Sequence, residues 1–320
     1  MISVLHLGVL DYGTALHLQR SLVDLRKQRR ISDVLLLLEH PAVITLGRNA
    51  SQKNLLVSPE TLHEKDVELF ESNRGGDITF HGPGQLVGYP IFDLRRFSPR
   101  IGAVEFVRRV EEALIRTCGD LGIPSERICG LTGVWTQGAG SNSSGDETNT
   151  QPGAARSTLS VCVETQRAAV PQGQPEVAGE QKKIAAIGVH ISSGVTSHGF
   201  ALNVSTDLDY FKLIVPCGIS DRPVTSIAQE LAGRGPVPNL EQVAHAVSFN
   251  FGRVFARQML WLESLDALAN TEEAQRQNEA GRHDQSTTIG VPLQVPKDLR
   301  EVRREQKAPQ LGSEDEVFLA

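Results

Sequence analysis

The segment Arg74-Gly-Gly-Asp-Ile-Thr-Phe-His-Gly-Pro-Gly-Gln85 carries the most information about this chain. Its five glycines and prolines surround Arg74, Thr79, His81 and Gln85, so the backbone bends sharply and leaves N–H groups open to close approach. The segment lacks the G-x-G-x-x-G and G-K-[ST] patterns of nucleotide-phosphate loops. Two interpretations remain open: a hairpin with two tight turns and a buried histidine, or a substrate-binding loop.

Apolar runs of strand length alternate with amphipathic stretches of helix length on both sides of this segment. Val34–Leu38 is a dense apolar run suited to a central strand, and Ala15–Arg29 places apolar residues at helical spacing. Several strand runs are too close together for helical crossovers, so part of the sheet is antiparallel. We therefore expect an α/β (α+β) fold with a mixed β-sheet flanked by helices. Further strands are expected at 42–46, 78–80, 86–92, 133–136, 183–191 and 199–204, and further helices at 104–117 and 240–258.

A second group of motifs contains a lysine and a cysteine that could act in catalysis. Lys183 opens the apolar strand Lys183-Ile-Ala-Ala-Ile-Gly188, and Cys217 stands between a proline and a glycine, where a thiol is accessible in a turn. Burial disfavours the charged form of a lysine, which suits proton transfer, and a cation beside a thiol favours the nucleophilic thiolate. Taken singly, each residue also fits a structural role, as a solvated lysine or a packed cysteine.

In combination the motifs are more specific. In chain order RGGDITFHGPGQ, KIAAIG, HGFALN and PCG resemble the octanoyl-[acyl carrier protein]:protein N-octanoyltransferase family of lipoate biosynthesis, and so do EHPAVITLGRNAS (Glu39–Ser51) and Gly133-Val-Trp135. The resemblance covers roughly residues 3–136 and 182–260. It implies the fold of lipoate- and biotin-protein ligase catalytic domains, an acyltransferase activity, and no metal or organic cofactor.

The resemblance also implies roles for individual residues. Cys217 is the expected acyl-thioester nucleophile, and Lys183 is expected to lower the pKa of that thiol and to relay protons. The donor is expected to be octanoyl-acyl carrier protein, and the acceptors the apo lipoyl domains of 2-oxoacid dehydrogenases and the glycine cleavage H protein. The expected acyl-binding residues are Arg74, Gly75, Gly76, Asp77, Ile78, Thr79, Phe80, His81, Ala186, Ile187, Gly188, Gly199, Phe200 and Ala201.

Two rival functions predict different residues from those in this chain. An ATP-dependent ligase of the same fold would need a phosphate-binding glycine and arginine loop and no nucleophilic cysteine. A catalytically inactive binding protein for lipoyl domains would not need both Lys183 and Cys217.

Two polar segments interrupt or follow the expected catalytic domain at 1–260. Residues 137–181 are rich in Gly, Ser, Asn, Gln and Pro, and we expect a disordered insertion there. Residues 261–320 are expected to form a charged, disordered tail. These segments together carry more negative charge than the net −6 of the whole chain, so the remaining body is near neutral and gives no indication of nucleic-acid binding. With neither a signal peptide nor a membrane-spanning run in the sequence, a cytoplasmic protein is expected.

The other cysteines and the histidines indicate no metal centre. Cys118, Cys129 and Cys162 have no CxxC spacing, and we expect the first two to be packing residues and Cys162 to have no specific role. His81, His190 and His198 fit no zinc spacing. For His81 we expect instead a role in orienting the acyl carbonyl or the loop.

Overall fold

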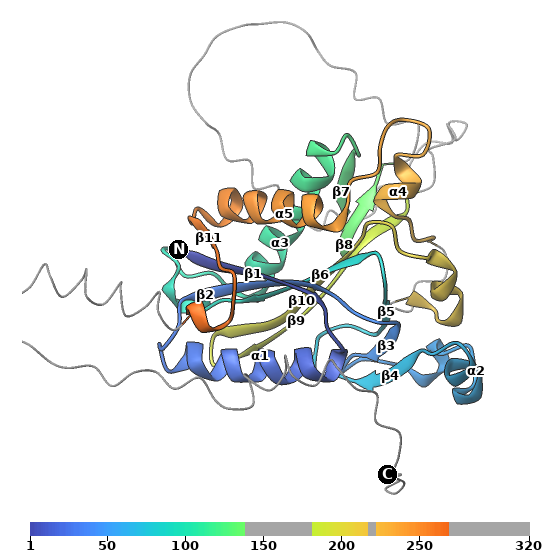
Figure 1. Cartoon of the computed structure of the whole chain (residues 1–320), viewed down its shortest axis with the longest axis horizontal. Coiled ribbons are helices and arrows are strands. Elements are labelled where there is room, and N and C mark those ends of the chain that lie inside the picture. Colours follow the sequence, from blue (N-terminus) through green and yellow to red (C-terminus); the bar gives the residue numbers. More distant parts are fainter. Residues whose placement is uncertain (138–180, 217–221, 269–320) are drawn as a thin grey trace, which may run out of the picture.

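The computed structural model describes residues 1–137, 181–216 and 222–268, whose strands form two sheets (Figure 1). The neighbouring strands β11, β1 and β2 of the large sheet are parallel, and every following pair is antiparallel. In spatial order it contains β11 (Met259–Trp261), β1 (Ile2–Val9), β2 (Asp33–Glu39), β6 (Gln85–Ile91), β10 (Val195–Asn203), β9 (Lys183–Ser192), β8 (Leu131–Thr136) and β7 (Ser125–Ile128). The small sheet contains β4 (Glu68–Glu71), β3 (Val43–Leu46) and β5 (Ile78–His81).

Helices cover both faces of the large sheet (Figure 1). Helix α1 (Tyr12–Lys27) lies on one face, and α3 (Ala103–Asp120) and α5 (Leu240–Phe255) pack together on the other. The small sheet lies beside the N-terminal end of α1, next to α2 (Pro59–Glu64). The short elements are η1 (Gln52–Asn54), η2 (Leu94–Arg96), η3 (Leu208–Leu213) and α4 (Ile227–Glu230).

This architecture confirms the expected mixed sheet flanked by helices. Six of the seven residues of β2 are buried, because helices cover both sides of this strand, as its unbroken apolar run indicates. The helix expected at Ala15–Arg29 begins earlier, because the Asp11 side chain accepts a hydrogen bond from the Thr14 N–H at 2.8 Å and caps the first turn. Helix α5 begins with a capping box formed by Asn239 and Gln242.

The structure contradicts the hairpin interpretation of residues 74–85. Strand β5 pairs with β3 in the small sheet, whereas β6 pairs with β2 and β10 in the large sheet. The turn Gly82-Pro83-Gly84 therefore carries the chain from one sheet to the other. His81, at the end of β5, is buried as that interpretation expected.

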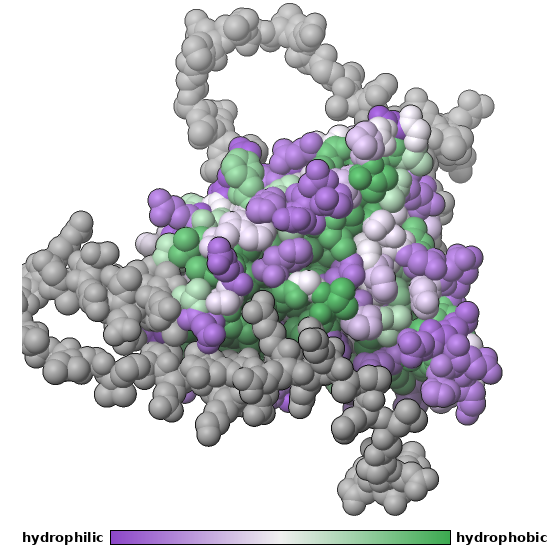
Figure 2. Space-filling model, in the orientation of Figure 1, coloured by the Kyte–Doolittle hydropathy of each residue, from purple (hydrophilic) through white to green (hydrophobic). Residues whose placement is uncertain are grey.

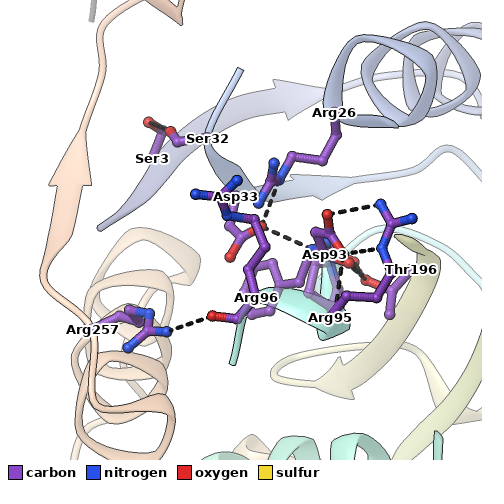
Figure 3. A network of polar contacts seen from close by, with 11 residues as sticks. Ser3, Arg26, Ser32, Asp33, Asp93, Arg95, Arg96, Thr196 and Arg257 are labelled. Atoms are coloured by element: carbon purple, nitrogen blue, oxygen red, sulfur yellow. Dashed lines mark hydrogen bonds and ion pairs between the residues drawn. The ribbon is translucent and has the colours of Figure 1, made fainter. Parts of the chain in front are cut away.

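A buried ion pair joins the end of α1 to the start of β2 (Figure 3). Arg26 Nε lies 2.7 Å from Asp33 Oδ1, and this oxygen also accepts a hydrogen bond of 2.9 Å from the Asp93 N–H. Asp93 in turn pairs with Arg95 of η2. Each buried carboxylate has a cationic partner, whose attraction offsets part of the cost of removing the charges from water, and the contacts join three chain segments.

The folded body continues past the expected boundary at residue 260. Trp261 pairs with Val4 in the sheet, and Leu268 is 4% exposed in the core beneath α1. The apolar side chains at 262, 265 and 268 drive this continuation, because each finds a place on the α1 side of the sheet. The expected insertion at 137–181 and the rest of the expected tail fall almost wholly on 138–180 and 269–320, outside the described residues.

The surface of the described body mixes polar and apolar side chains (Figure 2). Hydrophilic residues gather at the end of the molecule where α2 and β4 lie. Within the described ranges, no helix combines the length and apolarity needed to cross a membrane.

Candidate active site

A cavity of about 460 Å³, counting the part open to solvent, lies where the small sheet meets the α1 side of the large sheet. We call it the large cavity. Its walls come from the 74–81 segment, from β6, β9 and β10, and from the first residue of α1. They comprise Tyr12, Arg74, Gly76, Asp77, Thr79, His81, Val87, Tyr89, Ala186, Ile187, Gly188, His198, Gly199, Phe200 and Ala201.

Backbone hydrogen bonds hold the Arg74–Asp77 segment in place from both sides. The N–H groups of Gly47, Arg48 and Asn49 donate to the carbonyl oxygens of Asp77, Arg74 and Gly76 over 3.1–3.2 Å. On the other side, the Gly75 N–H donates to the Val189 carbonyl of β9 at 3.0 Å. The segment thus bridges the two sheets, and Gly75 serves this bridge without itself lining the large cavity.

The Asp77 carboxylate closes the same loop. It accepts hydrogen bonds from the Ser51 N–H at 3.1 Å, the Ile78 N–H at 2.8 Å and the Asn54 side-chain amide at 2.5 Å. These donors satisfy both carboxylate oxygens. Although Asp77 lines the large cavity, its polar atoms are engaged in shaping the loop.

Strand β5 presents alternate residues to the large cavity and to the core. Thr79 and His81 line the cavity. Ile78 and Phe80, which we also expected at the acyl-binding surface, point the other way, because successive strand residues face opposite sides. The Phe80 ring stacks on Tyr210 at a centroid distance of 4.8 Å. These two residues therefore support the site from behind.

Glycines let the backbones approach one another closely at the large cavity. A Cβ atom on Gly188 would lie 2.7 Å from the Gly75 carbonyl oxygen, and one on Gly199 would overlap the Gly88 carbonyl. Gly188 and Gly199 are paired across β9 and β10. No side chain fits at either position, so the glycines of the KIAAIG and HGFALN motifs are required by the packing.

A chain of hydrogen bonds runs behind the large cavity. Arg74 donates to the Thr45 hydroxyl through Nε at 3.1 Å and through Nη2 at 2.9 Å. His81 Nδ1 donates to Gln85 Oε1 at 2.7 Å, and the Gln85 amide donates to Asn203 Oδ1 at 2.9 Å. Asn203 then reaches the Thr225 carbonyl at 2.8 Å. Buried polar groups that are satisfied in this way make a wall rigid.

The histidines of this region are neutral at physiological pH. Burial lowers the pKa of His81 to about 3 and that of His198 to about 3, and nearby Arg74 contributes in the same direction. Burial likewise lowers the pKa of His40 to about 4 and raises that of Tyr89 well above its usual range. Because these rings are neutral, the cavity can accommodate an apolar ligand.

A second cavity, the small cavity, has a volume of about 280 Å³, counting the part open to solvent, and adjoins the first. Thr79, Ala186 and Ala201 line both. The small cavity also contains Lys183, which is only 6% exposed, and Pro216, the residue to which Cys217 is bonded. Cys217 itself lies outside the described residues.

The structure adds four residues to the large cavity that we did not expect from the sequence: Tyr12, Val87, Tyr89 and His198. His198 directly precedes Gly199 in the HGFALN motif, so the motif itself was a signal. Val87 and Tyr89 are two apart on an expected strand and share one face of it. Tyr12, at the start of a helix far away in sequence, carries no local signal.

The two cysteines of the described ranges differ in their exposure to solvent. Cys118 is fully buried in the core as expected, and burial raises its pKa to about 12. Cys129 is exposed, so the expectation that it is a packing residue is wrong; it stands in the turn between β7 and β8. Cys162 lies outside the described residues. The part of the chain that the structure describes contains no cluster of three His, Cys, Asp or Glu residues suited to a metal ion.

Solved structures share this fold at low sequence identity. A bipartite lipoate protein ligase from Thermoplasma acidophilum, studied with its E2 lipoyl domain, is 15% identical with a TM-score of 0.55, over 90% of this chain and 100% of its own. A lipoate-protein ligase A structure bound with ATP is 16% identical with a TM-score of 0.51, over 85% of this chain and 94% of its own. The two-sheet architecture is therefore that of lipoate ligase catalytic domains.

Sequence relatives narrow the class. The family model of the lipoyl protein ligase A/B catalytic domain matches residues 11–252. The octanoyltransferase of Koribacter versatilis is 56% identical over 85% of this chain and 92% of its own length, and that of Acidobacterium capsulatum is 52% identical over 82% and 94%. The chain belongs to the octanoyltransferases of this ligase-fold family and is a transferase.

Proposed function

We propose that this protein moves an octanoyl group from octanoyl-acyl carrier protein to a lysine of a lipoyl domain, through a thioester on Cys217. The observation that carries the proposal is the adjacency of the two cavities. The large cavity has mostly apolar walls in which the histidines are neutral, and the small cavity contains Lys183 and Pro216, the neighbour of Cys217. An acyl chain in the first would place its carbonyl carbon toward the second.

The first half-reaction forms the thioester. The Cys217 thiolate attacks the carbonyl carbon of the donor thioester, and the tetrahedral intermediate collapses with loss of the carrier thiolate, which takes up a proton from the Lys183 ammonium and leaves that lysine neutral. Backbone N–H groups near the glycine-rich segments suit the oxyanion that develops. The Lys183 ammonium stabilises the thiolate before attack.

The second half-reaction regenerates the enzyme. The neutral amine of the acceptor lysine attacks octanoyl-Cys217, an amide forms, and Cys217 leaves as the thiolate. The proton lost from the amine passes to Lys183, which acts as the relay. No ATP is consumed because the donor is already a thioester, and two steps on one nucleophile predict ping-pong kinetics.

Chain length is selected by the depth of the large cavity. Burial of about seven carbons at about 0.8 kcal/mol each stabilises the bound chain by roughly 5 kcal/mol, which separates a medium chain from an acetyl group. In this proposal the acyl chain contacts Arg74, Gly76, Thr79 and His81 on one side. On the other it contacts Ala186, Ile187, Gly188, Gly199, Phe200 and Ala201, all of which line the cavity.

The proposed acceptors are the lipoyl domains of 2-oxoacid dehydrogenases and of the glycine cleavage H protein, and the proposed compartment is the cytoplasm. The structural likeness to the Thermoplasma ligase studied with its E2 lipoyl domain supports an acceptor of this kind. The catalytic domain in this proposal is the described body, whose last packed residue is Leu268.

Intact-mass spectrometry tests the proposal directly. After incubation with octanoyl-acyl carrier protein and no ATP, we expect the wild-type protein to gain one octanoyl group that hydroxylamine removes. Cys217→Ala should gain none, and Cys129→Ala, which removes an exposed cysteine, should gain it as the wild type does. An adduct that survives in Cys217→Ala would refute the thioester.

The same experiment separates the two rival functions. If a lipoyl domain were modified only when octanoate and ATP were supplied, the protein would be a ligase like its solved structural neighbour. If neither Cys217 nor the lipoyl domain gained mass, the protein would be a binding protein.

A further inference from the structure

Trp135 lies beside Lys183 in the large sheet and has no role in the proposed reaction. It is 1% exposed, and its register places it opposite Lys183 across β8 and β9. Within the described residues, its indole N–H has no hydrogen-bond partner. A large aromatic ring at this depth with no polar partner acts through its faces.

The indole ring contacts two cations. Lys183 Nζ lies 5.1 Å from the ring centroid, and Arg222 Cζ lies 5.7 Å from it. Both distances fall within the range of cation–π attraction, which is strongest over tryptophan and grows when the pair is shielded from water. Since Lys183 is 6% exposed, its ammonium is shielded in this way.

Gly133 leaves the space in which the Lys183 side chain lies. Its φ is +128°, which L side chains rarely adopt, and a Cβ there would lie 2.8 Å from Lys183 Cε and 2.7 Å from the Ala185 carbonyl oxygen. The buried Glu111 carboxylate accepts a hydrogen bond of 3.1 Å from the Gly133 N–H. The backbone under the lysine is thereby fixed.

The backbone of Lys183 is fixed at both of its polar groups. Its N–H donates to the Pro223 carbonyl at 2.8 Å, and its carbonyl accepts from the Thr225 N–H at 2.9 Å. The Lys183 backbone is hydrogen-bonded, its aliphatic stem lies against Gly133, and its ammonium lies against the Trp135 ring. These contacts hold the side chain at the small cavity, where Pro216 also lies.

We propose that Trp135 is a positioning residue for Lys183, holding its ammonium against the indole face at the small cavity. This inference rests on the proposed function above. Trp135 touches no reacting atom in it: the ring restricts the lysine to the place from which it stabilises the thiolate.

The test compares Trp135→Phe with Trp135→Leu in single-turnover acylation of Cys217. We expect Trp135→Leu to lower the maximal acylation rate about tenfold while the donor concentration at half-maximal rate stays unchanged, since a strong shielded cation–π contact is of this order. Trp135→Phe, which keeps an aromatic face, should stay within about threefold of wild type. A rate for Trp135→Leu equal to that of wild type would overturn the inference.

A double-mutant comparison distinguishes positioning from a general structural effect. In a Lys183→Ala background, Trp135→Leu should cause no further loss, because there is no lysine left to position. The same factor of loss with and without Lys183 would overturn the inference.

These outcomes are distinguishable from failure of the proposed function. If wild-type protein forms no octanoyl-Cys217, the proposed function fails and the positioning role fails with it. If wild-type protein forms the adduct and the Trp135 variants form it equally fast, only the positioning role fails.

Discussion

The Tyr89 hydroxyl donates a hydrogen bond of 2.7 Å to His40 Nε2 beside the large cavity. The other ring nitrogen, Nδ1, lies 2.6 Å from the Leu10 carbonyl oxygen, which can only accept, so the proton of the neutral ring sits on Nδ1. Protonation of Nε2 would require the Tyr89 hydroxyl to rotate and accept instead of donate, and it would place a positive charge in a buried site. The neutral imidazole is therefore part of the folded state.

Stability should fall as the solution is acidified through the ordinary range of histidine. The pKa of His40 is lowered by burial to about 4, so above pH 6.5 the ring is neutral in both folded and unfolded chains. Below pH 6.5 His40 binds a proton in the unfolded chain, whereas in the folded chain it binds one only near pH 4. One such histidine costs about 2 kcal/mol of unfolding free energy between pH 7 and pH 5.

Urea unfolding at pH 7, 6 and 5 measures this effect. Burial also lowers the pKa values of His81 and His198 to about 3. The free energy of unfolding of the wild type should therefore change more steeply with pH than one histidine alone would cause. In His40→Asn the slope of unfolding free energy against pH should decrease by the amount that corresponds to roughly one bound proton. An unchanged slope in this variant would contradict the assignment.

A methyl group at Gly88 should destabilise the fold. Gly88 is paired with Phe200 across β6 and β10, and a Cβ there would overlap the Phe200 ring, which packs against Phe251 in the core. We expect Gly88→Ala to cost about 1–3 kcal/mol. In Gly119→Ala the new Cβ meets nothing within 4 Å in helix α3, and that variant should be more stable by roughly 0.5 kcal/mol. Thermal unfolding of both measures the difference, and an equal effect would count against the close approach.

Adjacent lysines should differ greatly in their effect on transfer. Lys183 lines the small cavity, whereas the Lys182 side chain is 37% exposed and lies 3.9 Å from Glu230. Lys183→Ala should lower the rate of octanoyl transfer by about 10²-fold or more, the contribution expected of an acid–base group, and Lys182→Ala should change it little. Steady-state transfer to a lipoyl domain measures both. Equal losses would shift the proposed role by one residue.

Residues 138–180 should be replaceable by a two-residue turn. The Thr136 N–H donates to the Lys182 carbonyl at 2.8 Å, so β8 and β9 already lie side by side at the point where the segment leaves and returns. An Asn-Gly turn closes such a pair. We expect the shortened protein to keep its melting temperature and its acylation of Cys217. Loss of acylation in a well-folded variant would assign the segment to the active site.

The sequence predicted elements whose own residues determine them. The apolar run of β2 and the helical spacing of α1 and α3 needed no tertiary information. Strand β4 was missed because it is an exposed strand with no apolar pattern, and β11 because it has only three residues. The partner of β5 could not be predicted either, since a short glycine-rich turn looks the same whether it returns to one sheet or leads to another.

The residues of the candidate site likewise divide into those that the sequence predicted and those that depend on tertiary packing. Motifs that are contiguous in sequence located most of the large cavity, and alternation along β5 explains why Ile78 and Phe80 face the core. Tyr12 joins the wall only because α1 packs beside the small sheet. Contributions of this kind depend on the packing of distant segments, which no local pattern encodes.

The turn at Gly82–Gly84 places the opposing walls of the large cavity in separate hydrogen-bonded ladders. Hydrogen bonds nevertheless connect the two ladders, because His81 of β5 is linked through Gln85 and Asn203 to Thr225, whose N–H donates to the Lys183 carbonyl. Thr79 of β5 also lines both cavities. For protein engineering, the chain length of the acyl group and the chemistry at the cysteine therefore have to be adjusted together.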